Sequence, residues 1–171
     1  MEKGYIHVYT GNGKGKTTAA FGLALRAACA GKKVYIGQFV KGMKYSEVEV
    51  EKYIPNIEIH QLGRSCFIRR DPTDEDIRLA KEGLKLCTTA LSNGENDVVI
   101  LDELNIALYF KLVTLQEVLY MLSKRKPHVE VVITGRYAPE EIINIADLVT
   151  EMKEIKHYYR DGVEAREGIE R

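Results

Sequence analysis

The sequence predicts an α/β fold in which an open, mostly parallel sheet carries helices on both faces. Three observations support this prediction. Apolar runs of strand length alternate with longer helical segments along the 171 residues, a loop of glycine and lysine follows the first apolar run, and two carboxylates follow the fourth. Strands that are buried on both faces are continuously apolar, and parallel neighbours need a long connection that is usually helical.

Each strand is predicted from a short apolar run bounded by polar or glycine residues. These runs are residues 5–9, 33–39, 57–62, 97–101, 129–134 and 148–152. The helices are predicted from composition and from end signals, since Gly31 stops the first, Thr73 caps the second ahead of an acidic turn, and Pro127 follows the third. Their ranges are 16–30, 73–91 and 115–123, with a short helix from Pro139.

Length and composition predict one domain over residues 1–171, and they argue against nucleic acid and membranes as partners. The 25 basic and 25 acidic residues cancel, so no overall field attracts nucleic acid or an anionic membrane surface. No apolar run approaches the roughly 18 residues of a membrane span. Cys29, Cys66 and Cys87 are widely spaced and odd in number, which indicates free thiols, no zinc site and a cytoplasmic location.

The loop after the first strand predicts a triphosphate-binding site. Its ATP-binding residues are Gly11, Asn12, Gly13, Lys14, Gly15, Lys16, Thr17 and Thr18. Glycines let backbone N–H groups turn towards phosphate oxygens, Lys16 is expected to reach the phosphates from a solvent-facing position, and the Thr17 hydroxyl to ligate Mg²⁺. Thr10 replaces a glycine of the general pattern, which indicates a variant loop. Arg26 is a weaker candidate, because it lies roughly 15 Å further along the helix.

Two further strands end in charged residues. Asp102 and Glu103 follow the fourth strand and resemble a Walker B motif, in which one carboxylate holds Mg²⁺ directly or through water while the other orients the reacting groups. Arg136 follows the fifth strand, where it can offset the charge of a leaving phosphate. The alternative for Asp102 and Glu103 is a strand that runs into a polar turn, and the alternative for Arg136 is a solvated arginine at a strand end. Lys16, Glu103 and Arg136 are therefore the predicted catalytic residues.

Several motifs occur in order along nearly the whole chain. They are residues 9–22, 38–42, 101–105 and 134–136, with 156–157 and 168–170 in the tail. Together they resemble the ATP:corrinoid adenosyltransferase family, whose version of the loop also has threonine at the position of Thr10. The resemblance implies a RecA-like P-loop fold, usually a homodimer, that transfers the 5′-deoxyadenosyl group of ATP to Co(I) of cobalamin or a precursor corrinoid and leaves triphosphate. It also implies Mg²⁺ or Mn²⁺ and an electron-donating reductase.

The resemblance further implies bulky apolar residues that displace the lower cobalt ligand, because Co(II) is hard to reduce while it keeps that ligand. Phe67 and Ile68 are expected in this role, since the chain has no tryptophan, and packing of Phe67 into the core is the alternative. Phe39 and Lys41 are the other expected corrinoid-binding residues. Cys66 is interpreted as a packed thiol rather than a cobalt ligand, and His157 as a hydrogen-bonding group at the surface.

Two other functions stay open at the level of the sequence. One is a P-loop kinase or ATPase, in which Glu103 orients water or an acceptor hydroxyl. The other is a nucleotide-dependent binding module without chemistry of its own. No histidine or second base lies near Glu103 in the sequence, which argues against phosphoryl transfer to a hydroxyl. ADP as the product would identify a kinase or ATPase, and intact triphosphate would identify the adenosyltransferase.

Overall fold

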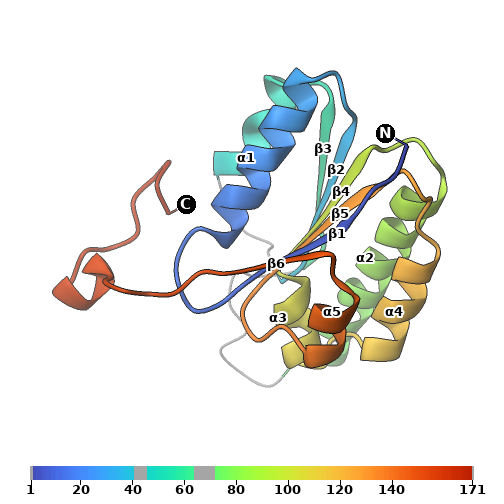
Figure 1. Cartoon of the computed structure of the whole chain (residues 1–171). Helices are drawn as coiled ribbons and strands as arrows, with labels where there is room; N and C mark the ends of the chain where they lie inside the picture. The colour runs from blue at the N-terminus through green and yellow to red at the C-terminus, as the bar shows by residue number, and fades with distance from the viewer. Residues whose placement is uncertain (1, 41–45, 64–71, 171) are drawn as a thin grey trace.

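The computed structural model describes residues 2–40, 46–63 and 72–170 and contains one six-stranded sheet (Figure 1). Its strands are β1 (Ile6–Thr10), β2 (Val34–Gln38), β3 (Ile57–Gln61), β4 (Val98–Asp102), β5 (Glu130–Thr134) and β6 (Leu148–Glu151). The spatial order is β3-β2-β4-β5-β1-β6, and every neighbouring pair is parallel. The predicted parallel sheet is confirmed, and each strand lies within one residue of its expected ends.

Among the described residues, five α-helices and one 3₁₀ helix lie between strands, and a second 3₁₀ helix follows the last strand. They are α1 (Lys16–Cys29), α2 (Asp74–Ser92), α3 (Leu104–Tyr109), α4 (Leu115–Ser123) and α5 (Glu140–Ile145), with η1 (Ser46–Lys52) and η2 (Tyr158–Asp161). Thr73 and Thr114 each accept a hydrogen bond from a backbone N–H of the first turn and begin α2 and α4 with a capping box. The sequence did not predict α3, because its six residues span fewer than two helical turns and give only a weak periodic signal. Within the described residues, no helix is both long and apolar enough to cross a membrane.

The helices divide between the two faces of the sheet. Figure 1 shows α1 on one face and α2, α3, α4 and α5 on the other. Side chains of a strand alternate between the faces, so β4 places Val98 and Ile100 in the cluster beneath α1, and Val99 and Leu101 in the cluster beneath α2 and α4. Burial on both faces explains why β4 is continuously apolar.

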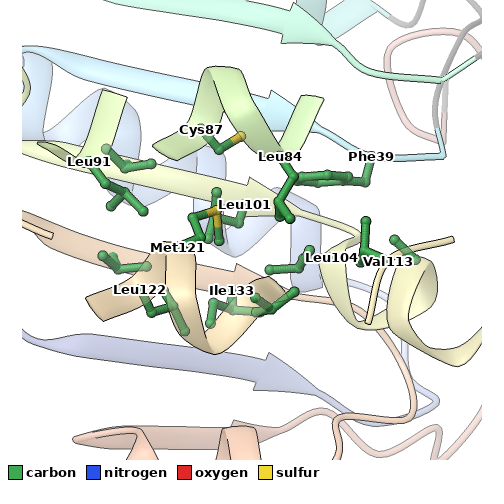
Figure 2. Close-up of a cluster of buried hydrophobic side chains, with 14 of the residues drawn as sticks. Phe39, Leu84, Cys87, Leu91, Leu101, Leu104, Val113, Met121, Leu122 and Ile133 are labelled. Carbon is green, nitrogen blue, oxygen red and sulfur yellow. The ribbon is translucent and has the colours of Figure 1, made fainter. Parts of the chain in front are cut away.

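The larger core cluster contains Phe39, which the sequence assigned to corrinoid binding. Figure 2 shows Phe39 beside Leu84 of α2, among the side chains that α2, α3 and α4 pack against the sheet. The Phe39 N–H donates to the Asp102 carbonyl, so the pairing of β2 with β4 continues one residue past the strand. The alternation of β2 then points the fully buried Phe39 side chain into the core. Phe39 is therefore a core residue outside the described wall of the cavity, and the assignments of Lys41, Cys66, Phe67 and Ile68 fall outside the described residues.

Candidate nucleotide and substrate site

The glycine-rich loop joins β1 to α1 and packs tightly against the chain that leaves β6. A Cβ on Gly11 would lie 2.4 Å from the Met152 carbonyl oxygen, and a Cβ on Gly13 would lie 2.8 Å from the Lys153 carbonyl carbon. The Gly13 N–H donates to the Met152 carbonyl at 2.7 Å. The absence of a side chain at these two glycines therefore lets the loop backbone lie against the segment after β6. This role is additional to letting a phosphate approach the loop backbone.

Lys16 is folded into the loop rather than exposed. Lys16 is the first residue of α1 and is only 7% exposed. Its Nζ donates to the carbonyl oxygens of Gly11 and Gly13 at 2.7 Å each. The prediction of a solvent-facing lysine is wrong, because the loop carbonyls curl around the ammonium. Burial lowers the pKa of Lys16, Glu103 opposes that shift, and Arg136 adds to it. Arg136 is thus close enough to Lys16 for the two charges to repel.

Asp102 lies behind the loop as a buried acceptor. Its Oδ1 accepts hydrogen bonds from the hydroxyls of Thr17 at 2.9 Å and Thr134 at 2.7 Å, and its Oδ2 accepts one from the Gln38 amide at 3.2 Å. Asp102 is fully buried. Asp102 thus joins the end of β5, through Thr134, to the start of α1, through Thr17. The cluster fixes Thr17 at the start of α1.

Three residues with left-handed backbones follow neighbouring strands of the sheet. Val40, Glu103 and Tyr137 each have φ of 60° and come after β2, β4 and β5. This conformation is strained for residues other than glycine and persists where the surrounding structure enforces it. All three line the same cavity. The turns therefore redirect side chains from the strand ends into that cavity.

The cavity has a volume of about 850 Å³ and a wall of mixed character. Phosphate-binding candidates contribute Gly13, Lys14, Gly15, Lys16, Thr17 and Thr18, together with Glu103 and Arg136. Apolar side chains contribute Phe21, Val40, Ile106, Phe110 and Tyr137, and the tail contributes His157, Gly168, Ile169 and Glu170. The structure thus brings Lys16, Glu103 and Arg136 to one cavity, as the sequence predicted. Gly11, Asn12, Asp102 and Arg26 are not part of its described wall, and Arg26 lies in the last turn of α1.

Sequence reasoning gave no site role to the tail or to several apolar residues of the wall. His157 was expected at the surface but lines the cavity, where its Nδ1 accepts from the Tyr159 N–H. A second base therefore shares the cavity with Glu103, which removes one argument against phosphoryl transfer. The helical spacing of Ile106 and Phe110 directly after the carboxylates was a usable signal. No local signal could place the tail against a loop so distant in the sequence.

The oxygen donors around Thr17 fit a hard divalent cation. The Thr17 hydroxyl contacts a carboxylate oxygen of Asp102, and Glu103 adds a second carboxylate in the cavity wall. Among the described residues, no group of three or more His, Cys, Asp or Glu side chains is arranged to hold a metal. Mg²⁺ in nucleotide sites is bound by one or two protein oxygens, with water and substrate phosphates completing its shell. The donor set is compatible with that mode.

The parallel sheet, the glycine and lysine loop before α1 and the carboxylates after β4 define a P-loop nucleotide-binding protein of the RecA-like kind. A KaiC-like protein from Pyrococcus horikoshii OT3 has a similar fold, with a TM-score of 0.51 at 17% identity over 90% of this chain and 74% of that one. Residues 2–171 match the family described as ATP:corrinoid adenosyltransferase BtuR/CobO/CobP, and the chain belongs to this family.

Curated relatives resemble the chain over almost its whole length. A corrinoid adenosyltransferase of Sinorhizobium sp. is 39% identical over 99% of this chain and 81% of its own length. A corrinoid adenosyltransferase of Escherichia coli strain K12 is 36% identical over 99% of this chain and 86% of its own length. The family match extends over residues 2–171 and therefore includes the glycine and lysine loop, the carboxylates after β4 and the tail.

Proposed function

We propose that the chain transfers the 5′-deoxyadenosyl group of ATP to Co(I) of a reduced corrinoid and releases triphosphate. The observation that carries this proposal is the mixed wall of the cavity. Lys16, Arg136 and the loop offer positive charge and N–H groups for a triphosphate. Ile106, Phe110 and Tyr137 offer an apolar surface in the same space. A corrinoid is a broad, flat macrocycle, so the pairing of these two surfaces suits a reaction between it and ATP.

The reaction requires little from the protein as acid or base. Co(I) donates an electron pair to C5′, the Co–C bond forms, and the bond from C5′ to the triphosphate oxygen breaks with its electrons on the leaving group. No proton moves in this step, so no side chain has to act as a base. The protein must hold the cobalt in line with C5′ and stabilise the charge that develops on the triphosphate.

Lys16 and Arg136 are proposed to stabilise the leaving group. Lys16 is held near the phosphate position by two carbonyl oxygens, which reduces the cost of ordering it when ATP binds. Glu103 and Thr17 are proposed to hold Mg²⁺, with Asp102 orienting the Thr17 hydroxyl from behind. Bound Mg²⁺ would supply further positive charge to the triphosphate. A homodimer, a cytoplasmic location and a reductase that supplies Co(I) belong to the same proposal.

The apolar part of the wall is proposed to contact the corrinoid. Tyr137 stacks on Tyr109 with ring centroids 4.3 Å apart and planes at 27°, although both side chains are exposed. Ile106 lies on α3, Phe110 directly follows α3 as its C-cap residue, and both extend the surface from this pair. Phe110→Ala should raise KM for the corrinoid without raising KM for ATP. Tyr120→Ala, on the exposed face of α4, is the matched aromatic control and should change neither constant.

The decisive experiment separates adenosyl transfer from phosphoryl transfer. The protein is incubated with ATP, Mg²⁺ and chemically reduced cobalamin, and the light-sensitive alkylcobalt spectrum and phosphorus products are followed. We expect one intact triphosphate for each adenosylated cobalt. Lys16→Ala should abolish transfer, whereas Asp97→Asn, at the opposite end of β4, should not. Formation of ADP without corrinoid, at the rate of the best turnover, would replace this proposal by an ATPase in which His157 or Glu103 activates water.

A further inference from the structure

The tail segment, residues 157–170, is attached to the glycine-rich loop through Lys14. The Lys14 Nζ donates to the Tyr158 hydroxyl at 3.1 Å, to the Ile169 carbonyl at 3.2 Å and to Glu170 Oε1 at 2.7 Å. An ammonium group has three N–H donors, so these contacts use all of them. Lys14 therefore has no donor left for a phosphate in this arrangement, although its position in the loop predicts an ATP contact.

Glu170 is the centre of this attachment. Its carboxylate accepts hydrogen bonds from the Arg166 backbone N–H at 2.9 Å and from the Arg166 guanidinium at 3.2 Å, in addition to Lys14 and the Tyr158 hydroxyl. The side chain is 15% exposed. The partners lower the pKa of Glu170, with Arg166 first and Lys14 second, and Glu170 is the main cause of the raised pKa of Lys14. The carboxylate is thus ionised whenever the enzyme is near neutral pH.

The attachment matters because the same tail segment forms part of the cavity wall. His157, Gly168, Ile169 and Glu170 line the cavity together with the loop. A wall made by an exposed segment stays in place only if something anchors it, since the segment's other described residues are largely exposed. The contacts of Lys14 and Glu170 join residues 156 positions apart and provide that anchor.

We propose that Lys14 and Glu170 are positioning residues of the ATP site, which act as one pair to hold the tail segment against the loop as a wall for the bound nucleotide. Lys14 then contributes to ATP affinity through Glu170 and not by contacting a phosphate. The inference rests on the proposed nucleotide site but not on adenosyl transfer, because it concerns binding alone.

The test is a double-mutant cycle on binding of the β,γ-imido analogue of ATP with Mg²⁺, measured by titration calorimetry without corrinoid. Lys14→Met and Glu170→Gln should each weaken binding about fivefold, which corresponds to about 1 kcal/mol. The double variant should also lose about fivefold, because both changes break one pair. Glu167→Gln, an exposed glutamate of the same tail segment, should bind as the parent protein does. Lys14→Arg keeps a positively charged donor for Glu170 and should bind within about twofold of the parent protein.

Three further readouts make the outcome decisive. In turnover assays, Lys14→Met and Glu170→Gln should raise KM for ATP and leave kcat unchanged, and their urea unfolding midpoints should match that of Glu167→Gln. Unchanged binding by Glu170→Gln, or an additive loss of about 25-fold in the double variant, would overturn the proposal. The additive result would assign Lys14 to direct phosphate contact. Coupled binding losses in a protein that makes no alkylcobalt would refute the proposed function and leave this inference standing.

Discussion

Replacing the buried carboxylate of Asp102 tests whether its hydrogen bonds stabilise the fold or only serve the metal. Asp102→Ala removes the acceptor of Thr17, Thr134 and Gln38 at a fully buried position. Each hydrogen bond contributes about 1 kcal/mol net, and a buried donor left without an acceptor costs about 1–3 kcal/mol. We therefore expect Asp102→Ala to lower the free energy of unfolding by about 3–5 kcal/mol.

Asp102→Asn should behave differently because of a neighbouring amide. The Asn oxygen can keep both threonine hydroxyls, but its new N–H₂ would face the N–H₂ of Gln38. Among the described residues, no donor reaches the buried Gln38 Oε1. A half turn of the Gln38 amide would bring that oxygen to the Asn N–H₂, in exchange for the long 3.5 Å contact of Nε2 with Glu47 Oε1. The variant should thus lose no more than about 1 kcal/mol.

Urea unfolding followed by circular dichroism gives the free energies of both variants, and equal m-values would show that the comparison is valid. Binding of Mg²⁺ and ATP by Asp102→Asn should be weaker than that of the parent protein, since the negative charge behind Thr17 is lost. If Asp102→Ala cost less than about 1 kcal/mol, or if Asp102→Asn cost as much as Asp102→Ala, the hydrogen-bond argument would be wrong.

Three further predictions concern packing, thiol reactivity and pH. Gly37→Ala should lower the free energy of unfolding by about 1–3 kcal/mol, because the new Cβ would lie 2.7 Å from Cys87 Sγ. Gly22→Ala on α1 should stabilise the protein, because its new Cβ would have nothing within 4 Å. Equal urea midpoints for the two variants would contradict this prediction. Burial raises the pKa of the Cys87 thiol to about 12, so peptide mass spectrometry after iodoacetamide near neutral pH should find exposed Cys29 alkylated and Cys87 unmodified. The Thr114 backbone N–H donates to the Glu117 carboxylate and lowers the pKa of Glu117. The contribution of Glu117 to stability is therefore complete above the unfolded pKa of about 4.3 and is lost as the pH falls through the folded pKa. Glu117→Gln should therefore flatten the acid side of the stability curve, and an unchanged curve would exclude this role.

The sequence alone determined the features that depend on short-range signals. Short runs rich in apolar residues located all six strands of the described sheet within one residue, and Thr73 marked the start of α2 because its capping box lies within four residues. The order of strand, glycine and lysine loop, and helix indicated the phosphate site. The two carboxylates after β4 were equally local, although the sequence did not separate the buried Asp102 from Glu103 in the cavity wall.

The tertiary structure alone decided which side chains meet. Phe39 is a core residue because the pairing of β2 with β4 continues past the strand end, and Lys16 is buried because the carbonyls of its own loop enclose it. The contact between Lys14 and Glu170 joins the beginning of the chain to its tail. Periodicity and turn chemistry act over a few residues, whereas such contacts depend on how the sheet brings distant strand ends together. For this reason the sequence located the phosphate loop, and only the folded chain showed what surrounds it.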